Sequence, residues 1–137
     1  MTPVKKIMTV DPTTIDRADP LSAAMSALES APYHHLVVTE NDQPVGMLST
    51  TDLVRLLHDM EFEIDGPLRN TIDEYYTIED AMSVGLQSIS ATSSVRDAAI
   101  ILSQGTFHSI VVLDEDRLAG IVTTTDLARY IVDTTEQ

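Results

Sequence analysis

The sequence contains no cysteine, few basic side chains and no long apolar run. Without cysteine the chain can form no disulfide, no zinc–thiolate site and no cysteine nucleophile. No apolar run reaches the roughly 18 residues that a membrane-spanning helix needs. Lys5 and Lys6 precede the stretch "IMTVDPTT", which is not the apolar core of a signal peptide. We therefore expect a cytoplasmic protein that neither spans a membrane nor is exported.

Basic residues are outnumbered: 8 Lys and Arg stand against 22 Asp and Glu, for a formal net charge of −14. Nucleic acids and anionic membrane surfaces are excluded as partners, because both bind proteins through Lys and Arg. Abundant acid with little lysine is typical of halophilic proteins, whose self-repulsion is screened by a salty cytoplasm. An ordinary soluble acidic protein is the alternative.

Motifs for nucleotide-dependent or covalent catalysis are also missing. The sequence has neither the G-x-x-x-x-G-K-[ST] loop nor the G-x-G-x-x-G turn. Its threonine runs lack an adjacent base and orienting group, so they do not form a nucleophilic triad. We expect that the protein is not an enzyme.

What the chain does contain is an internal repeat. The length of 137 residues and the hydrophobic fraction of 43% suit one globular domain. A shift of 74 positions aligns residues 3–58 with 77–132 without a gap, which indicates two copies of one unit sharing a core. The aligned pairs include Met8/Met82, Ile15/Ile89, Ala24/Ala98, Leu28/Leu102, His34/His108, Gly46/Gly120 and Asp52/Asp126. The predicted organisation is a first unit at 1–58, a linker at 59–77 and a second unit at 78–137.

Each copy predicts the element order β-α-β-β-α and hence an α/β fold. Brief strands at 14–15 and 88–89 precede helices whose apolar residues recur every three or four positions. These stripes are Leu21, Ala24, Met25 and Leu28 in the first copy, and Val95, Ala98, Ala99 and Leu102 in the second. Two β-branched strands follow in each copy, joined by the turn-like sequences "ENDQP" and "DEDRL". A second helix then begins at Thr50 and at Thr124.

Both copies close on one signature, "GMLSTTDL" at 46–53 and "GIVTTTDL" at 120–127. This G-h-h-[ST]-x-x-D-h pattern, the duplicated unit and the leading segments "IMTV" and "AMSV" together resemble the cystathionine β-synthase (CBS) domain. The resemblance covers nearly the whole chain. It implies a stand-alone Bateman module, in which two CBS units related by a pseudo-twofold axis bind AMP, ADP or ATP, with or without Mg²⁺, in the cleft between them. It also implies a homodimer and a regulated partner protein that the sequence does not identify.

The signature places a carboxylate at the start of a helix. Free N–H groups and the helix dipole make such a start suitable for phosphate or hydroxyl groups. The resemblance assigns the ribose hydroxyls to Asp52 and Asp126, and assigns ribose or phosphate contacts to the hydroxyls of Ser49, Thr51, Thr123 and Thr125. The same spacing is also a capping box, which would use these side chains to satisfy backbone donors. The two roles are compatible.

The resemblance implies further contacts around the ligand. It makes His34, His35 and His108 face phosphate, and makes Ala24, Tyr33, Ala98 and Phe107 border the adenine. Ser109 stands where the second copy would have the counterpart of His35, which removes a possible positive charge. Surface strand positions for the histidines, and core packing for the aromatic residues and alanines, are the alternatives. A metal site at His34 and His35 is not expected, because adjacent strand residues point in opposite directions.

Arg55 and Arg129 lie one helical turn beyond the two aspartates. At this spacing each can pair with its aspartate or reach a phosphate, and we expect the ion pair.

Three functions stay open from the sequence. The first is a sensor of adenine nucleotides. The second is a binder of S-adenosylmethionine, whose cationic group suits a strongly acidic protein. The third is an architectural dimerisation module with vestigial sites, which the intact Asp52 and Asp126 disfavour.

Overall fold

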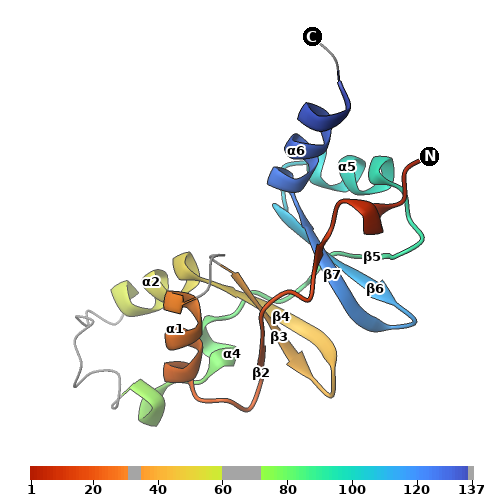
Figure 1. Ribbon diagram of the computed structural model, residues 1–137. Coiled ribbons are helices and arrows are strands. Elements are labelled where there is room, and N and C mark those ends of the chain that lie inside the picture. Colours follow the sequence, from red (N-terminus) through yellow and green to blue (C-terminus); the bar gives the residue numbers. More distant parts are fainter. Residues whose placement is uncertain (31–34, 60–71, 136–137) are drawn as a thin grey trace. The chain divides into compact units, whose positions relative to one another are not determined.

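The chain folds into two units that do not coincide with the two sequence copies (Figure 1). The structure, a computed structural model, describes residues 1–30, 35–59 and 72–135. One unit consists of residues 13–85 and is called here the Asp52 unit. The other combines residues 1–12 with 86–137 and is called the Asp126 unit. Packing therefore groups the first twelve residues with the second copy, whereas the repeat places them in the first.

The Asp52 unit is a three-stranded sheet with helices packed on its hairpin, and residues 72–75 are also helical. Its elements in chain order are β2 (Thr14–Asp16), α1 (Leu21–Ser30), β3 (His35–Glu40), β4 (Gln43–Ser49), α2 (Thr50–Asp59) and α4 (Ile78–Ala81). The strand order is β2-β3-β4, with β2 parallel and β4 antiparallel to the central strand. The α/β class and the predicted β-α-β-β-α order are confirmed.

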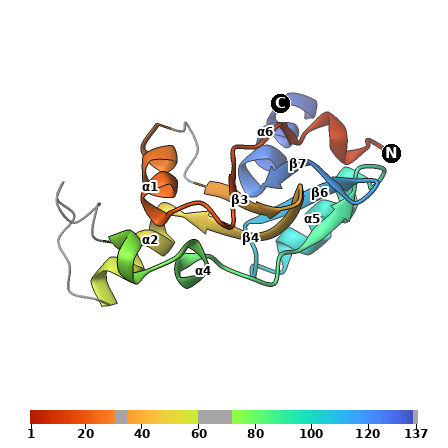
Figure 2. The same cartoon turned by 90° about the horizontal axis from the view of Figure 1, so that it is seen from below.

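The Asp126 unit repeats this arrangement and adds one strand. Its elements are η1 (Val4–Lys6), β1 (Thr9–Val10), β5 (Ser88–Ser90), α5 (Val95–Ser103), β6 (Ser109–Asp114), β7 (Arg117–Thr123) and α6 (Thr124–Thr134). The strand order is β1-β7-β6-β5. In each unit one helix contacts each strand of the antiparallel hairpin (Figures 1 and 2). No helix in the described ranges is long and apolar enough to cross a bilayer.

The two hairpins have the same register. Val38 pairs with Gly46 and Val112 pairs with Gly120, and in both hairpins an irregularity follows directly after that valine. Each loop has two residues with positive φ, Asn41 and Asp42 in one and Glu115 and Asp116 in the other. This backbone is that of the tight primed turns whose twist matches the strands they join.

The predicted apolar stripes face the two cores. On α1 all four stripe residues are buried beneath the sheet. On α5 Val95, Ala98 and Leu102 are buried and Ala99 is half-buried. Ile72 also lies in the Asp52 core, so the end of the predicted linker contributes to packing.

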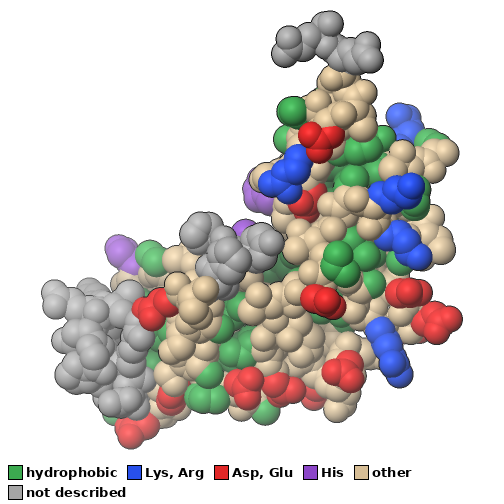
Figure 3. Space-filling view, viewed as in Figure 1, with side chains coloured by type: hydrophobic (Ala, Val, Ile, Leu, Met, Phe, Trp, Pro, Cys, Tyr) green, Lys and Arg blue, Asp and Glu red, His purple; other side chains and the backbone are tan. Residues whose placement is uncertain are grey.

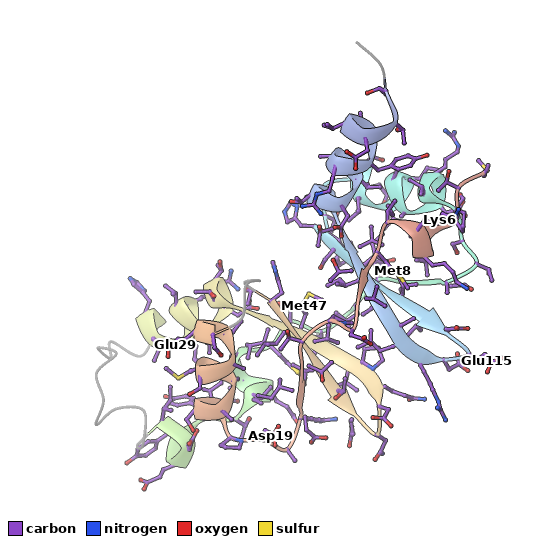
Figure 4. All side chains as sticks on the ribbon, in the orientation of Figure 1. Lys6, Met8, Asp19, Glu29, Met47 and Glu115 are labelled. Atoms are coloured by element: carbon purple, nitrogen blue, oxygen red, sulfur yellow. The ribbon has the colours of Figure 1, made fainter. Side chains whose placement is uncertain are left out.

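The segment that leads into each copy packs on the hairpin of the other copy. In the Asp126 unit β1 pairs antiparallel with β7, Thr9 lying opposite Ile121. In the Asp52 unit Met47 and Ser83 exchange two backbone hydrogen bonds of 3.0 and 2.8 Å. Figure 4 labels Met8 and Met47, which lie on these two contacts. Each leading segment pairs with an outer strand, β7 or β4, whose backbone groups would otherwise be unpaired on that side. This exchange of segments accounts for the mismatch between repeat and packing.

Charged side chains form hydrogen bonds and ion pairs that stabilise α5 and α4. The Ser94 backbone N–H and, less strongly, its hydroxyl donate to Asp97 at the start of α5 and lower the pKa of that carboxyl. Arg17 forms ion pairs with Glu79 of α4 and with Glu40, the latter at 2.9 Å. The hydrogen bond from Arg17 lowers the pKa of Glu79 and raises that of the guanidinium.

Candidate functional site

The two copies of the signature form the same capping box where a strand runs directly into a helix. In the Asp126 unit the Thr123 N–H donates to Asp126 Oδ2 at 2.9 Å, and the Asp126 N–H donates back to Thr123 Oγ1 at 3.2 Å. In the Asp52 unit the matching distances between Ser49 and Asp52 are 2.8 and 3.1 Å. Each hydroxyl also donates to the same carboxylate oxygen. The capping role that the sequence left open is therefore present in both units.

The second oxygen of each carboxylate is only loosely engaged. Asp126 Oδ1 lies 3.8 Å from the Arg129 guanidinium. Asp52 Oδ1 lies 3.6 Å from the Arg55 guanidinium and 3.5 Å from the Ser83 hydroxyl. These distances exceed those of good hydrogen bonds, so Oδ1 keeps capacity to accept from another donor. The arginines take the ion-pair geometry expected from the sequence.

Both carboxylates are buried, with exposed fractions of 9% for Asp52 and 7% for Asp126. A buried carboxylate needs partners, and here the cap supplies them to one oxygen. The cap also fixes the side-chain position, so Oδ1 presents a preorganised acceptor. Such an acceptor can receive a hydroxyl from a sugar with little loss of side-chain entropy.

The glycine of the signature is explained by the leading segment that crosses it. A Cβ atom at Gly120 would lie 2.6 Å from the Thr9 carbonyl oxygen and 2.7 Å from the Met8 sulfur. A Cβ at Gly46 would lie 2.6 Å from the Met82 sulfur. A side chain at either position would overpack the contact. The leading segments thus border the signature, which sequence reasoning missed although "IMTV" and "AMSV" occur at matching positions.

A pocket of about 530 Å³ lies beside the Asp126 carboxylate within the Asp126 unit. Its walls come from the N-terminal segment and from α6: Thr2, Lys6, Ile7, Asp126, Arg129, Tyr130, Asp133 and Thr134. A hydrogen bond of 3.1 Å between the Thr2 and Tyr130 hydroxyls joins these two walls. The volume falls within the range of small-molecule sites.

The remaining predicted residues have varied positions. His35 of β3 pairs with Ser49 of β4, directly before α2. The His108 carbonyl accepts the Thr124 N–H at 3.2 Å, so both histidines adjoin a helix start. Thr51 and Thr125 are exposed in the first helical turns. Their predicted ligand contacts stay predictions.

The residues predicted to border adenine are mostly in or near the cores. Ala24 and Ala98 have no exposed surface and belong to the two cores, as the packing alternative expects. Phe107 is half-buried before β6. Tyr33 and His34 lie outside the described residues.

Comparison with known sequences identifies the family. The sequence profile of the CBS domain matches residues 4–59 and 71–133, which is most of the chain in two segments. The chain belongs to the CBS domain family. The uncharacterised protein MJ1404 of Methanocaldococcus jannaschii is 25% identical to this chain over 142 residues. The match covers 96% of this chain but 32% of that protein, so the chain spans about a third of its relative.

Solved structures share the CBS-pair fold. The crystal structure of CBSX2 in complex with AMP is 21% identical, with a TM-score of 0.77 over 97% of this chain and 98% of that one. The CBS domain pair of protein MJ0100, in complex with 5′-methylthioadenosine and S-adenosyl-L-methionine, is 23% identical, with a TM-score of 0.78 over 98% and 99%. A CBS domain protein of unknown function from Thermoplasma acidophilum is 26% identical, with a TM-score of 0.73 over 94% and 68%.

Proposed function

We propose that this CBS pair is a regulatory module that binds an adenosine ligand through the carboxylates of Asp52 and Asp126. The observation that carries the proposal is the division of each carboxylate between a cap and a loosely engaged oxygen. A loosely engaged acceptor held rigidly beside a helix start can bind the hydroxyls of a ribose.

The ligands of the similar structures support this assignment. CBSX2 was crystallised with AMP and the MJ0100 pair with S-adenosylmethionine and 5′-methylthioadenosine. These molecules share adenosine and differ at the 5′ position. Recognition of the ribose by an aspartate would suit all of them, so the ligand's 5′ group must be read by other side chains. An adenine nucleotide is our first candidate.

S-adenosylmethionine is the second candidate. The formal net charge of −14 favours a cationic ligand over a triphosphate at long range. In either case the ligand can regulate only by binding two conformations of the module with different affinity. We assign no reaction to the site.

We also propose that the module forms a homodimer. An apolar groove of about 500 Å³ lies between α5, α6 and the N-terminus. Ile131 lines it, and Ile100 and Val132 on the same two helices are exposed. Burying this apolar surface against a second copy would remove it from water.

The test is calorimetric titration in high KCl with AMP, ADP, ATP plus Mg²⁺, S-adenosylmethionine and 2′-deoxy-AMP. Asp52→Ala and Asp126→Ala would each remove a cap and a proposed ribose acceptor. Asp97→Ala is the matched control, because Asp97 forms the same capping box on α5 away from both signatures. The proposal expects the control to bind normally while at least one of the two site variants loses binding about tenfold or more.

Two results would contradict the proposal. Equal binding of AMP and 2′-deoxy-AMP would remove the ribose as the recognised group. Absence of binding with every ligand would favour the architectural module, with both signatures acting as caps alone.

A further inference from the structure

The two copies differ in charge where their leading segments meet the signature. The leading segment of the first copy, which packs in the Asp126 unit, contains Lys5 and Lys6, and Lys6 lines the pocket beside Asp126. A shift of 74 positions replaces these lysines by Glu79 and Asp80 in the segment that packs in the Asp52 unit. Two basic residues in one leading segment therefore correspond to two acidic residues in the other.

The acidic counterparts are already committed to local structure. Glu79 forms an ion pair with Arg17, and Asp80 accepts the Thr77 N–H at 2.8 Å in the cap of α4. Lys6, in contrast, is exposed and has no ion-pair partner among the described residues. An unpaired ammonium at the wall of a pocket can bind an anion without first giving up another contact.

The charge of the whole units follows the same direction. Residues 13–85 contain 14 acidic and 3 basic residues, a net charge of −11. Residues 1–12 and 86–137 contain 8 acidic and 5 basic residues, a net charge of −3. On the face drawn in Figure 3, Lys and Arg side chains gather over the unit that contains α5 and α6. The electrostatic repulsion of a bound anion is therefore weaker in the Asp126 unit than in the Asp52 unit.

We propose that the Asp126 pocket selects the phosphorylated adenosine ligand, with Lys6 binding its 5′-phosphate, while the Asp52 signature selects an uncharged or cationic adenosine. The inference rests on the proposed function, because it takes the ribose contact of Asp126 as given. Asp126 and Asp133 also line the pocket. The Asp126 carboxylate would bind the ribose. Arg129 lies 3.8 Å from that carboxylate and has a counterpart in Arg55 of the Asp52 unit, so Lys6 is the cation that distinguishes the two units.

The sequence pattern alone pointed the other way. Ser109 stands in the second copy where the first has His35, so the sequence left the phosphate affinity of the second copy in doubt. An imidazole is largely uncharged at neutral pH, whereas a lysine keeps its charge. Lys6 belongs to the leading segment of the first copy, so its place beside the second signature follows from the fold only.

The experiment is titration of the full chain with AMP and with adenosine at pH 7.5. Asp52→Ala and Asp126→Ala assign each ligand to a signature. Lys6→Glu and Lys6→Gln test the cation, and Lys5→Glu is the matched control, since Lys5 is exposed but does not line the pocket. Thermal unfolding of every variant checks that η1 still packs.

Lys6→Glu is expected to weaken AMP binding about tenfold and Lys6→Gln less, with adenosine binding unchanged within about twofold. Asp126→Ala should abolish AMP binding. Added KCl should weaken the binding of AMP but not the binding of adenosine. Equal AMP affinity in Lys6→Glu and Lys5→Glu, or loss of AMP binding in Asp52→Ala alone, would overturn this inference and leave the proposed function intact. A wild-type chain that binds neither molecule would overturn this inference, and it would overturn the proposed function as well only if ADP, ATP and S-adenosylmethionine also fail to bind.

Discussion

At the scale of single residues, each signature aspartate gives its two oxygens different partners. Oδ2 of Asp126 accepts the backbone and side-chain donors of Thr123, while among the described residues Oδ1 has only Arg129 as a partner, at 3.8 Å. Capping therefore uses Oδ2, and the proposed ligand contact would use Oδ1, so the two roles do not need the same atom. A variant that removes the carboxylate changes both stability and binding, so each effect needs its own control.

A stability prediction arises from the two hairpin loops. Glu115 has φ of +51° and its counterpart Asn41 has φ of +53°. Asparagine tolerates this left-handed backbone better than glutamate does, because its short amide bonds to the local backbone. Glu115→Asn should stabilise the protein by roughly 0.5–1 kcal/mol, and the reverse change Asn41→Glu should destabilise it by a similar amount.

Urea unfolding of both variants measures this difference. Glu115 lies at the tip of its hairpin, away from the Asp126 pocket (Figure 4), so ligand binding should not change. Loop charge would shift the two midpoints with the same signs, so the series is repeated in 1 M KCl, where repulsion between exposed charges is screened. Shifts that vanish in 1 M KCl would assign the effect to loop charge, and shifts in the same direction would contradict the prediction.

Sequence reasoning at this scale found the residues whose partners are close in the chain. Ser49 and Asp52 are three residues apart, so their capping geometry follows from helix periodicity. It missed Lys6, Met8 and Ser83, whose neighbours lie more than thirty residues away in the chain, on α6, β7 and α2 respectively. A local pattern shows that such a residue recurs, but it does not show what the residue contacts.

At the scale of elements, the sequence predicted the helices and strands of each repeated unit but not η1, β1 or α4. The second helices begin at Thr50 and Thr124, and the short strands include 14–15 and 88–89, as expected. These elements were predictable because burial of one face imposes a period. The short pairings made by the leading segments were not predictable, since two-residue strands have no period to read.

The cap of α5 gives a prediction about pH. The pKa of Asp97 is lowered in the folded state from its ordinary value of 3.8. The folded protein therefore holds this proton more weakly than the unfolded chain, and the carboxylate stabilises the fold above that ordinary value. The contribution should disappear as the pH falls through the lowered pKa.

Asp97→Asn should consequently be less stable than the wild type at pH 7 and approach it as the pH falls through the lowered pKa of Asp97. Ser94→Ala should cost about 1 kcal/mol through the lost cap but keep most of the pH dependence, because the backbone N–H is the stronger donor to Asp97. Thermal unfolding between pH 2 and 7 measures both, and a constant difference across that range would contradict the assignment.

At the scale of the whole molecule, charge is the dominant feature. The net charge of −14 on 137 residues implies self-repulsion that opposes the folded state. The Debye length falls from about 30 Å at 0.01 M salt to about 3 Å at 1 M. We therefore predict that the melting temperature rises with KCl over this range, by roughly 4–8 °C for a gain of about 1–2 kcal/mol.

Calorimetry across the KCl series measures the rise, and sucrose at equal osmolarity controls for general effects of crowded solution. A melting temperature that does not change with KCl would mean that the acidic side chains are too well separated to repel one another, and would remove the support for a halophilic origin.

The crossing of the leading segments has a consequence for any attempt to divide the chain. A fragment ending near residue 70 would keep Gly46 uncovered, and its own residues 3–10 would have no β7 to pair with. Two such fragments could satisfy each other by trading their first residues, as the copies do within one chain. Separate expression of the halves should yield proteins that are incomplete alone and complementary when mixed. Duplication of the ancestral gene would then have joined, in a single polypeptide, two subunits that already depended on each other.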